Sequence, residues 1–138
     1  IRVVKYGPDF TNGSNNYQGN AGNDEVIFRY ADVVLMVAEA KLRAATPDVA
    51  GALSLVNGLR VARNAKPLAS VVLVNTANLY AGNTILAERG RELYWEKVRR
   101  TDLIRFGMFL KIWQYKPTDD PKYLVYPVPS QSLSVSPY

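Results

Sequence analysis

The sequence predicts a mainly α fold, and three observations lead to that class. Apolar residues recur at the three- and four-residue spacing of a helix over residues 26–62, and a helical pattern returns over residues 84–110. Runs rich in β-branched and aromatic residues are short, so they predict brief extended segments. Apolar residues make up 48% of the 138 residues and charged residues 21%, which is typical of a globular protein with one core.

The first 24 residues predict an extended segment followed by a loop. Residues 1–6 are rich in β-branched and aromatic side chains, which favour an extended backbone. Residues 7–24 are mostly Gly, Asn, Ser and Thr, and Tyr17 is one of their few apolar side chains. Such a composition predicts a long polar loop.

Residues 25–63 predict a helical hairpin. We expect its first helix to begin near Val26 and to carry one continuous apolar face. A second set of apolar side chains predicts burial of this helix on most of its sides. The first face consists of Ile27, Ala31, Val34, Leu35, Ala38 and Leu42, and the second of Val33, Met36, Val37 and Ala40.

The second helix of the hairpin is expected to begin with Thr46 as its N-cap and Pro47 at its first position, and to end near Ala62. A tight turn and small side chains near the crossing resemble a tetratricopeptide-type hairpin. We therefore expect a tetratricopeptide-like α/α superhelical scaffold with irregular loops and short extended segments. One hairpin cannot bury its apolar faces alone, so neighbouring helices are expected later in the chain or in a missing part.

The connection that follows the hairpin is poorly patterned. Residues 70–74 predict a short strand, and residues 76–79 a helical turn. Two signature helices are then expected within residues 83–110.

The first signature helix is expected to run from about Thr84 to Lys97. The second is expected to run from about Thr101, as N-cap, to Leu110, with Asp102 in its first turn. Residues 111–138 predict an extended tail, because each residue before a proline is disfavoured in a helix.

Composition and charge exclude several classes of function. The chain has no cysteine and no histidine, so thiol chemistry, the commonest general base and the commonest transition-metal ligand are excluded. The net charge is +5, but the basic residues are spread along the chain. The closest cluster, Lys97, Arg99 and Arg100, is interleaved with Glu96 and Asp102. A phosphate-binding surface needs basic residues concentrated on one face, so we expect no nucleic-acid partner.

The strongest candidates for chemistry are Glu88, Glu92 and Glu96, whose spacing stacks them on one helix face. Carboxylate metal sites in helical bundles use Glu-x-x-His pairs from other helices, and the chain has no histidine. Nearby arginines can neutralise the carboxylates; these are Arg89, Arg91, Arg99 and Arg100. We therefore expect a structural role, no metal, no cofactor and no enzymatic activity.

Aromatic residues in the loops suggest a different kind of site. Sugars bind by stacking their C–H faces on aromatic rings beside amides and carboxylates. Tyr17 lies among asparagines, and Trp113 and Tyr115 follow the last signature helix. These three are the candidate glycan-binding residues, whereas Trp95 and Phe106 are expected in the core.

Four stretches, taken in order, resemble one family. They are Arg29–Val33 continuing to Ala38-Glu39-Ala40; Asn57–Arg63, with the pattern Asn-x-x-Arg-x-x-Arg; Ile85–Leu93 followed by Arg99–Gly107; and Tyr126-Pro127-Val128-Pro129. The sequence resembles the C-terminal portion of the SusD/RagB-like outer-membrane lipoproteins. Lys97 departs from the family, which usually has glycine there; if that site needs a positive φ, lysine adopts it at a cost of ~1 kcal/mol.

The resemblance implies that residues 1–138 form a single domain, the C-terminal part of a larger protein. That protein would be a non-catalytic glycan-binding subunit of an outer-membrane polysaccharide uptake system, capping a SusC-like TonB-dependent transporter. It would be surface-exposed and held to the membrane by an N-terminal lipid anchor absent from this chain. The motif residues would be scaffold. The alternative, which periodicity alone allows, is a generic tetratricopeptide-like protein-interaction scaffold.

Overall fold

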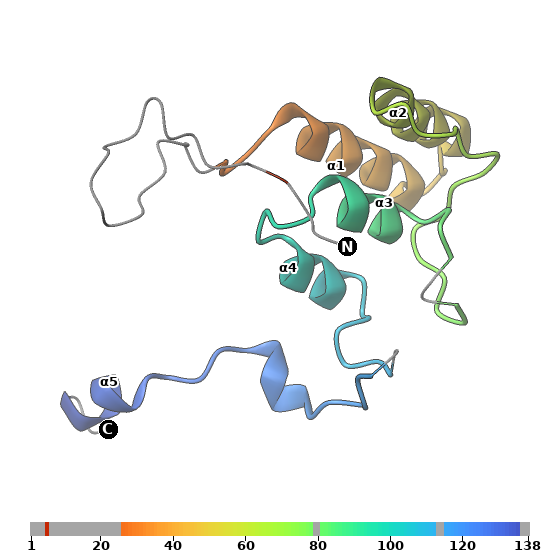
Figure 1. Ribbon diagram of the computed structural model, residues 1–138. Coiled ribbons are helices and arrows are strands. Elements are labelled where there is room, and N and C mark those ends of the chain that lie inside the picture. Colours follow the sequence, from red (N-terminus) through yellow and green to blue (C-terminus); the bar gives the residue numbers. More distant parts are fainter. Residues whose placement is uncertain (1–4, 6–25, 79–80, 113–114, 136–138) are drawn as a thin grey trace, which may run out of the picture.

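The computed structural model describes residue 5 and residues 26–78, 81–112 and 115–135, and the regular elements in these ranges are helices joined by irregular connections (Figure 1). Helices α1 and α2 span Tyr30–Arg43 and Val49–Ala62, and helices α3 and α4 span Ile85–Glu92 and Arg99–Arg105. The tail holds a 3-10 helix, η1, at Pro121–Leu124 and a last helix, α5, at Ser130–Val135. The prediction of a mainly α, tetratricopeptide-like fold is confirmed.

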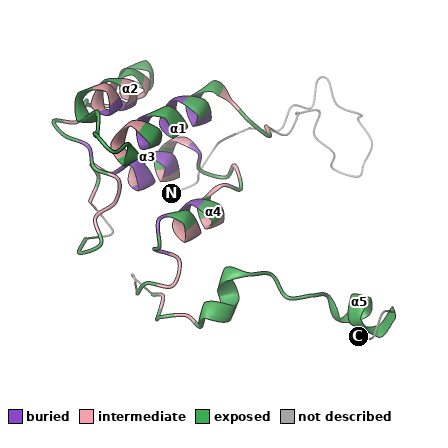
Figure 2. Cartoon of the chain, turned by 180° about the vertical axis from the view of Figure 1, so that it is seen from behind, coloured by how far each residue is buried: buried purple, intermediate pink, exposed green. Residues whose placement is uncertain are grey.

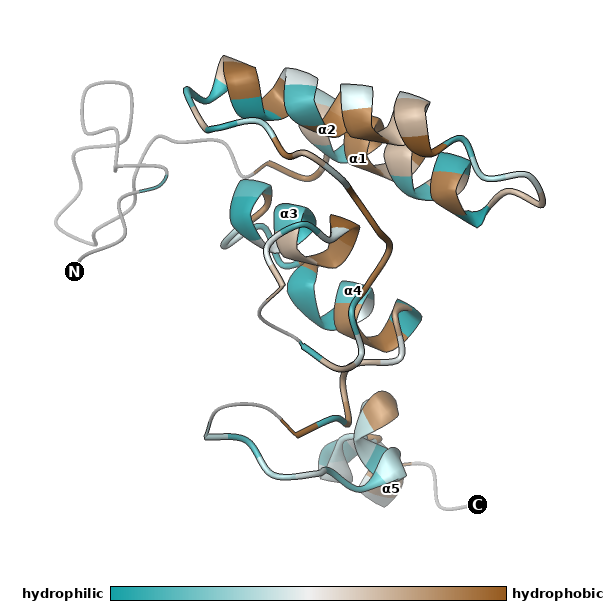
Figure 3. Cartoon of the chain, turned by 90° about the vertical axis from the view of Figure 1, so that its right-hand side faces the viewer, coloured by the Kyte–Doolittle hydropathy of each residue, from teal (hydrophilic) through white to brown (hydrophobic). Residues whose placement is uncertain are grey.

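The first four helices form one packed body. Helices α1 and α2 lie side by side as the predicted hairpin, α3 packs on α1, and α4 packs on α3 (Figures 1 and 3). The segment from η1 to α5 lies outside this body, although Arg100 of α4 contacts its Tyr123 and Tyr126, and each of residues 121–135 is exposed (Figure 2). The core therefore belongs to the first four helices and their connections.

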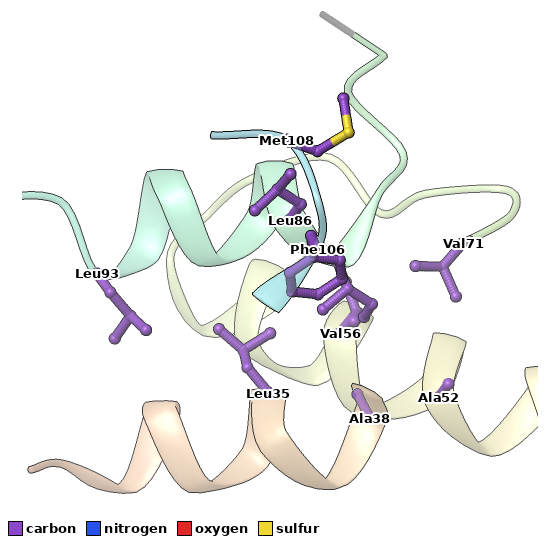
Figure 4. Packing of buried hydrophobic residues seen from close by; sticks show 10 residues of the cluster. Leu35, Ala38, Ala52, Val56, Val71, Leu86, Leu93, Phe106 and Met108 are labelled. Carbon is purple, nitrogen blue, oxygen red and sulfur yellow. The ribbon is translucent and has the colours of Figure 1, made fainter. Parts of the chain in front are cut away.

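One hydrophobic core joins these helices, and Figure 4 shows its side chains meeting between α1 and α2 on one side and α3 on the other. Ala38 and Ala52 are both fully buried, and their small size lets α1 and α2 approach closely. Phe106 is 8% exposed, so its predicted place in the core is confirmed. The cluster consists of Leu35, Ala38, Ala52, Val56, Val71, Ile85, Leu86, Leu93, Phe106 and Met108.

Helix α1 begins four residues later than predicted, at Tyr30 instead of near Val26. Arg29 is extended (φ −145°, ψ 161°), because its side chain reaches the end of α3 and hydrogen-bonds Glu92 and Glu96. Ile27, placed by periodicity on the buried face, is therefore outside the helix and 79% exposed. A long-range ionic contact thus overrides local helix propensity here.

The predicted burial of α1 on most of its sides is wrong within the described part of the chain. Helices α2 and α3 cover the face of Leu35 and Ala38, which are fully buried. On the other face, Val33, Met36 and Val37 are 45%, 43% and 44% exposed.

Helix α2 begins at Val49, and its N-cap is Asp48 instead of the predicted Thr46. The Asp48 carboxylate accepts the Gly51 N–H at 2.8 Å and pairs with Lys41 at 2.5 Å. An ionised cap that also pairs with a cation competes better than a threonine hydroxyl two residues earlier.

Helix α3 ends at Glu92, five residues before the predicted end at Lys97. The Glu92 carbonyl accepts a hydrogen bond from Lys5 Nζ at 2.8 Å and another from Arg29 Nη2. The Glu96 N–H, which a continuing helix would direct to that carbonyl, bonds to Leu93 O at 3.1 Å instead. Side chains from outside the helix therefore satisfy its terminal carbonyl.

Helix α4 is displaced toward the N-terminus relative to the prediction. It begins at Arg99, and the Thr101 hydroxyl donates to Val98 O at 2.8 Å instead of capping the helix. It ends at Arg105 instead of Leu110, because Gly107 takes a φ of 68° and reverses the chain.

The remaining local predictions are only partly met. The strand expected at residues 70–74 is reduced to one parallel bridge between Val72 and Thr84. Residues 76–78 are not helical, because the Asn75 side chain accepts the N–H groups of Ala77 and Asn78 and forms a turn. In the tail predicted as extended, Asp120 caps η1 by accepting the Lys122 N–H.

Lys97 has a φ of 63°, so this site does need the positive φ that a glycine adopts freely. We expect Lys97→Gly to be more stable than Lys97→Ala by about 1 kcal/mol, because only glycine takes this conformation without a steric cost. Both variants lose the lysine side chain, so their difference in urea denaturation isolates the backbone effect. Equal stabilities would contradict this prediction.

Candidate functional site

The carboxylates that the sequence singled out, Glu88, Glu92 and Glu96, lie where α3 meets the hairpin, and their side chains are largely buried. Glu88 is 5% exposed, and its carboxylate contacts Arg60 at 2.8 Å and Arg91 at 2.5 Å. Two cations hold this carboxylate in one orientation. A general acid or base needs an oxygen that can exchange a proton with substrate, so Glu88 is built for structure.

Glu92 and Glu96 are occupied in the same way. Arg29 spans both, with contacts of 2.6 Å to Glu92 and 2.8 Å to Glu96. Arg63 also pairs with Glu92 at 2.8 Å, and Lys5 pairs with Glu96 at 2.5 Å. The sequence predicted that arginines close in sequence would neutralise the three carboxylates. Of these, only Arg91 does so; the other observed partners come from distant segments.

The pKa values follow from these contacts. Burial alone would raise the pKa of Glu96, but hydrogen bonds from Arg29 and Lys5 outweigh it and lower the pKa to about 2. Burial likewise opposes Arg63 and Arg29 at Glu92, and the cations again prevail, so the pKa of Glu92 is also lowered. The hydrogen bond to Glu96 is the main cause that raises the pKa of Arg29. Glu92 and Glu96 therefore stay ionised at neutral pH.

Arg89 lies deeper than the other cations and joins α1, α3 and α4. Its Nε donates to Asp102 Oδ2 at 2.8 Å, and its Nη1 lies 2.8 Å from Asp32 Oδ1. The second contact lacks hydrogen-bond geometry, so it acts as an ion pair only. Asp102, 1% exposed, also accepts from Arg105 at 2.8 Å. Asp102 lies in the first turn of α4 as predicted, and its partner Arg89 is buried.

The structure does not bring the three candidate glycan-binding residues together. Tyr115 is 97% exposed and has a φ of 63°, so its ring projects into solvent. Tyr17 and Trp113 lie outside the described residues.

A cavity of about 690 Å³ opens at the turn between α3 and α4. Tyr94 and Trp95 form part of its lining, with ring centroids 5.9 Å apart and planes inclined by 15°. Trp95 is 66% exposed, so its predicted place in the core is wrong. Its φ of 64° turns it away from the axis of α3 once the helix has ended. Arg91 and Arg99 line the same cavity.

Two further properties of the described residues bear on function. In the described ranges, acidic residues do not gather into a group that could hold a metal ion. None of the helices in the part of the chain that the structure describes is long and apolar enough to cross a bilayer.

The comparison with protein families decides the identity of the chain. A family model described as the SusD family, SusD_RagB, matches residues 2–137. The chain belongs to the SusD family. This is a non-catalytic glycan-binding family associated with the outer membrane. A search of curated proteins found no match to the chain.

The stretches that resemble the SusD family hold the helices together. In the Asn-x-x-Arg-x-x-Arg stretch, Asn57 exchanges two hydrogen bonds with the backbone of Leu68, of 3.0 Å and 2.8 Å. Arg60 and Arg63 of the same stretch bind Glu88 and Glu92 on α3. The second SusD-like stretch therefore meets the third in space through ion pairs.

The first SusD-like stretch makes ion pairs of its own from α1. Its Glu39 accepts from Arg105 of α4 at 3.0 Å and 2.9 Å and from Arg43 at 2.8 Å. Asp32 of the same stretch pairs with Arg89. A helix-opening signature on α1 thus supplies both carboxylates that tie this helix to the later block.

Acid should weaken the ion pairs of Glu96 in a defined range of pH. The pKa of Glu96 is lowered from 4.5 to about 2, so ionised Glu96 stabilises the fold above about pH 4.5 and that stabilisation is lost as pH falls toward 2. We expect Glu96→Gln to lower the melting temperature at neutral pH, and the difference from wild type to shrink steadily below about pH 4.5. A difference that stays constant down to about pH 3 would contradict the prediction.

Sequence reasoning missed the cavity at the α3–α4 turn. Tyr94 and Trp95 were read with a helix that would have continued to Lys97. The signal that could have placed them at the surface is Lys97 itself, because a residue at a usual glycine position marks the end of regular helix.

Proposed function

We propose that this chain is part of a lipid-anchored glycan-binding subunit that caps a SusC-like TonB-dependent transporter and has no catalytic activity. Membership of the SusD family is the observation that carries the proposal. The ion pairs support the absence of catalysis, because Glu88, Glu92, Glu96 and Asp102 are each held by arginine or lysine. Residues 1–138 would form a single domain at the C-terminal end of the subunit.

Glycan contacts in this proposal come from exposed aromatic residues outside these ion pairs. Tyr115 is the exposed member of the predicted set, with Tyr17 and Trp113 as further candidates. The Tyr94–Trp95 pair adds a second aromatic surface, which lies beside a cavity. Aromatic rings stack on the C–H faces of sugars and exclude water from them.

The test of ligand class is calorimetry of the full-length protein against a panel of soluble glycans. We expect heat of binding with at least one glycan. Binding to a peptide together with no heat from any glycan would instead favour the protein-interaction scaffold. The exposed apolar side chains Val33, Met36 and Val37 on α1 would then be the candidate surface for the protein partner.

The test of location and partner uses the intact gene and the membrane fraction. The gene should encode a lipoprotein signal with its cysteine upstream of this chain. The full-length protein should co-purify with a TonB-dependent barrel from detergent-solubilised outer membranes. A gene without the lipoprotein signal would contradict this part of the proposal.

A further inference from the structure

The cavity at the α3–α4 turn combines an aromatic surface with a positive charge. Its volume of about 690 Å³ falls in the range of small-ligand sites, which is roughly 300–1,000 Å³. The stacked rings of Tyr94 and Trp95 are 44% and 66% exposed, so their faces and edges remain open to a ligand.

Arg99 is a cation on the cavity wall that still has unused hydrogen-bond donors. Its Nη1 donates to Leu86 O at 2.8 Å, which uses one of the five N–H donors of a guanidinium. No carboxylate within the described ranges forms an ion pair with it. Arg89 and Arg91, which line the same cavity, are both paired with carboxylates.

Gly90 gives Arg99 its position. A Cβ atom at residue 90 would lie 2.8 Å from Arg99 Nη1 and 3.2 Å from Cζ, so a larger residue would displace the guanidinium from α3. The position has an electrostatic consequence. Loss of hydration lowers the pKa of Arg99, and the charge of Asp102 opposes this effect without cancelling it. Arg99 is nevertheless exposed, so an anion that enters the cavity can reach its remaining N–H groups.

From these observations we infer that the cavity binds an acidic sugar residue, with its ring on Tyr94 and Trp95 and its carboxylate on Arg99. The planar carboxylate of a uronic acid fits the fork of a guanidinium, which can donate two parallel hydrogen bonds to it. The inference rests on the proposed glycan-binding function and names its class of ligand.

The experiment is calorimetry of the full-length protein with oligogalacturonate, oligomannuronate and a glucuronate-containing oligosaccharide. Each is paired with its carboxyl-reduced counterpart, which keeps the sugar and linkage and removes only the charge. We expect at least one acidic member to bind about ten-fold or more tightly than its reduced partner, as one charge-assisted hydrogen-bonded pair provides.

Three variants locate the effect. Arg99→Gln should weaken binding of the acidic member about ten-fold or more and leave the reduced member unchanged. Trp95→Ala should weaken both. Lys111→Gln makes the same change in net charge at an exposed residue outside the cavity and should weaken neither. If Arg99→Gln does not fold, Arg99→Lys replaces it; the charge stays but the fork is lost, so we expect a partial loss.

Each contrary outcome has one meaning. Equal affinity for every acidic and reduced pair would overturn the acidic-sugar inference and leave glycan binding intact. Selective binding of acidic members that survives Arg99→Gln would move the site away from this cavity and overturn the assignment. The absence of heat with these oligosaccharides and with every other glycan would overturn the proposed function itself. Another segment of the full-length protein found filling the cavity in a crystal structure would also overturn the site.

Discussion

Replacing Arg89 by methionine should lower the free energy of unfolding by about 3–5 kcal/mol, because it leaves two buried carboxylates without their shared cation. Asp102 and Asp32 are 1% and 6% exposed, so water cannot readily take the place of the guanidinium. Methionine keeps much of the volume of the side chain, so the loss reports charge more than packing. Urea denaturation at neutral pH measures it.

Arg91→Met is the matched control for this variant. Arg91 lies on the same helix and also pairs with a carboxylate, Glu88, but its side chain is 45% exposed. Glu88 keeps a second partner in Arg60. An exposed pair contributes at most about 1 kcal/mol, so Arg91→Met should change stability far less. Equal losses in the two variants would show that burial of the Arg89 network contributes little.

Leu35→Ala should cost about 2–5 kcal/mol, because it opens a cavity where α1 meets α2 and α3. Leu35 is fully buried and faces Val56 and Phe106 in the core (Figure 4). Val33→Ala on the exposed side of the same helix should cost under about 1 kcal/mol. Glycan affinity per folded molecule should be the same in both, since neither residue lines the cavity of Tyr94 and Trp95.

A loss of stability in Val33→Ala as large as that in Leu35→Ala would contradict the one-sided burial of α1. Val33 is 45% exposed in the described chain, so such a result in the full-length protein would mean that another part of the protein covers this face. Comparing the 138-residue chain with the full-length protein separates these two readings.

The order of helices and the hairpin's share of the core could be predicted from residue spacing. Leu35, Ala38, Ala52 and Val56 follow the helical period of the hairpin and are fully buried. The family could be recognised because its motifs are charged residues at fixed separations, which a single sequence displays. The structural role of Glu88, Glu92 and Glu96 also followed from composition, since a chain without histidine lacks the ligands that usually join glutamates in such metal sites.

Helix boundaries and the candidate site could not be predicted in this way. Helix α1 starts late and α3 stops early because Arg29 crosses from one to the other and binds Glu92 and Glu96. Periodicity continues through both boundaries and carries no sign of a partner more than 60 residues away. The same early stop places Trp95 at the surface beside a cavity instead of in the core.

The sequence by itself determined the helical class, the hairpin, the SusD family and the exclusion of histidine and thiol chemistry. Tertiary structure alone decided which arginine meets which carboxylate, where the helices end, and which aromatic rings and cations line a cavity. The physical reason is range. Helical spacing and family motifs are local patterns, whereas an ion pair forms between side chains that only the folded chain brings within about 3 Å.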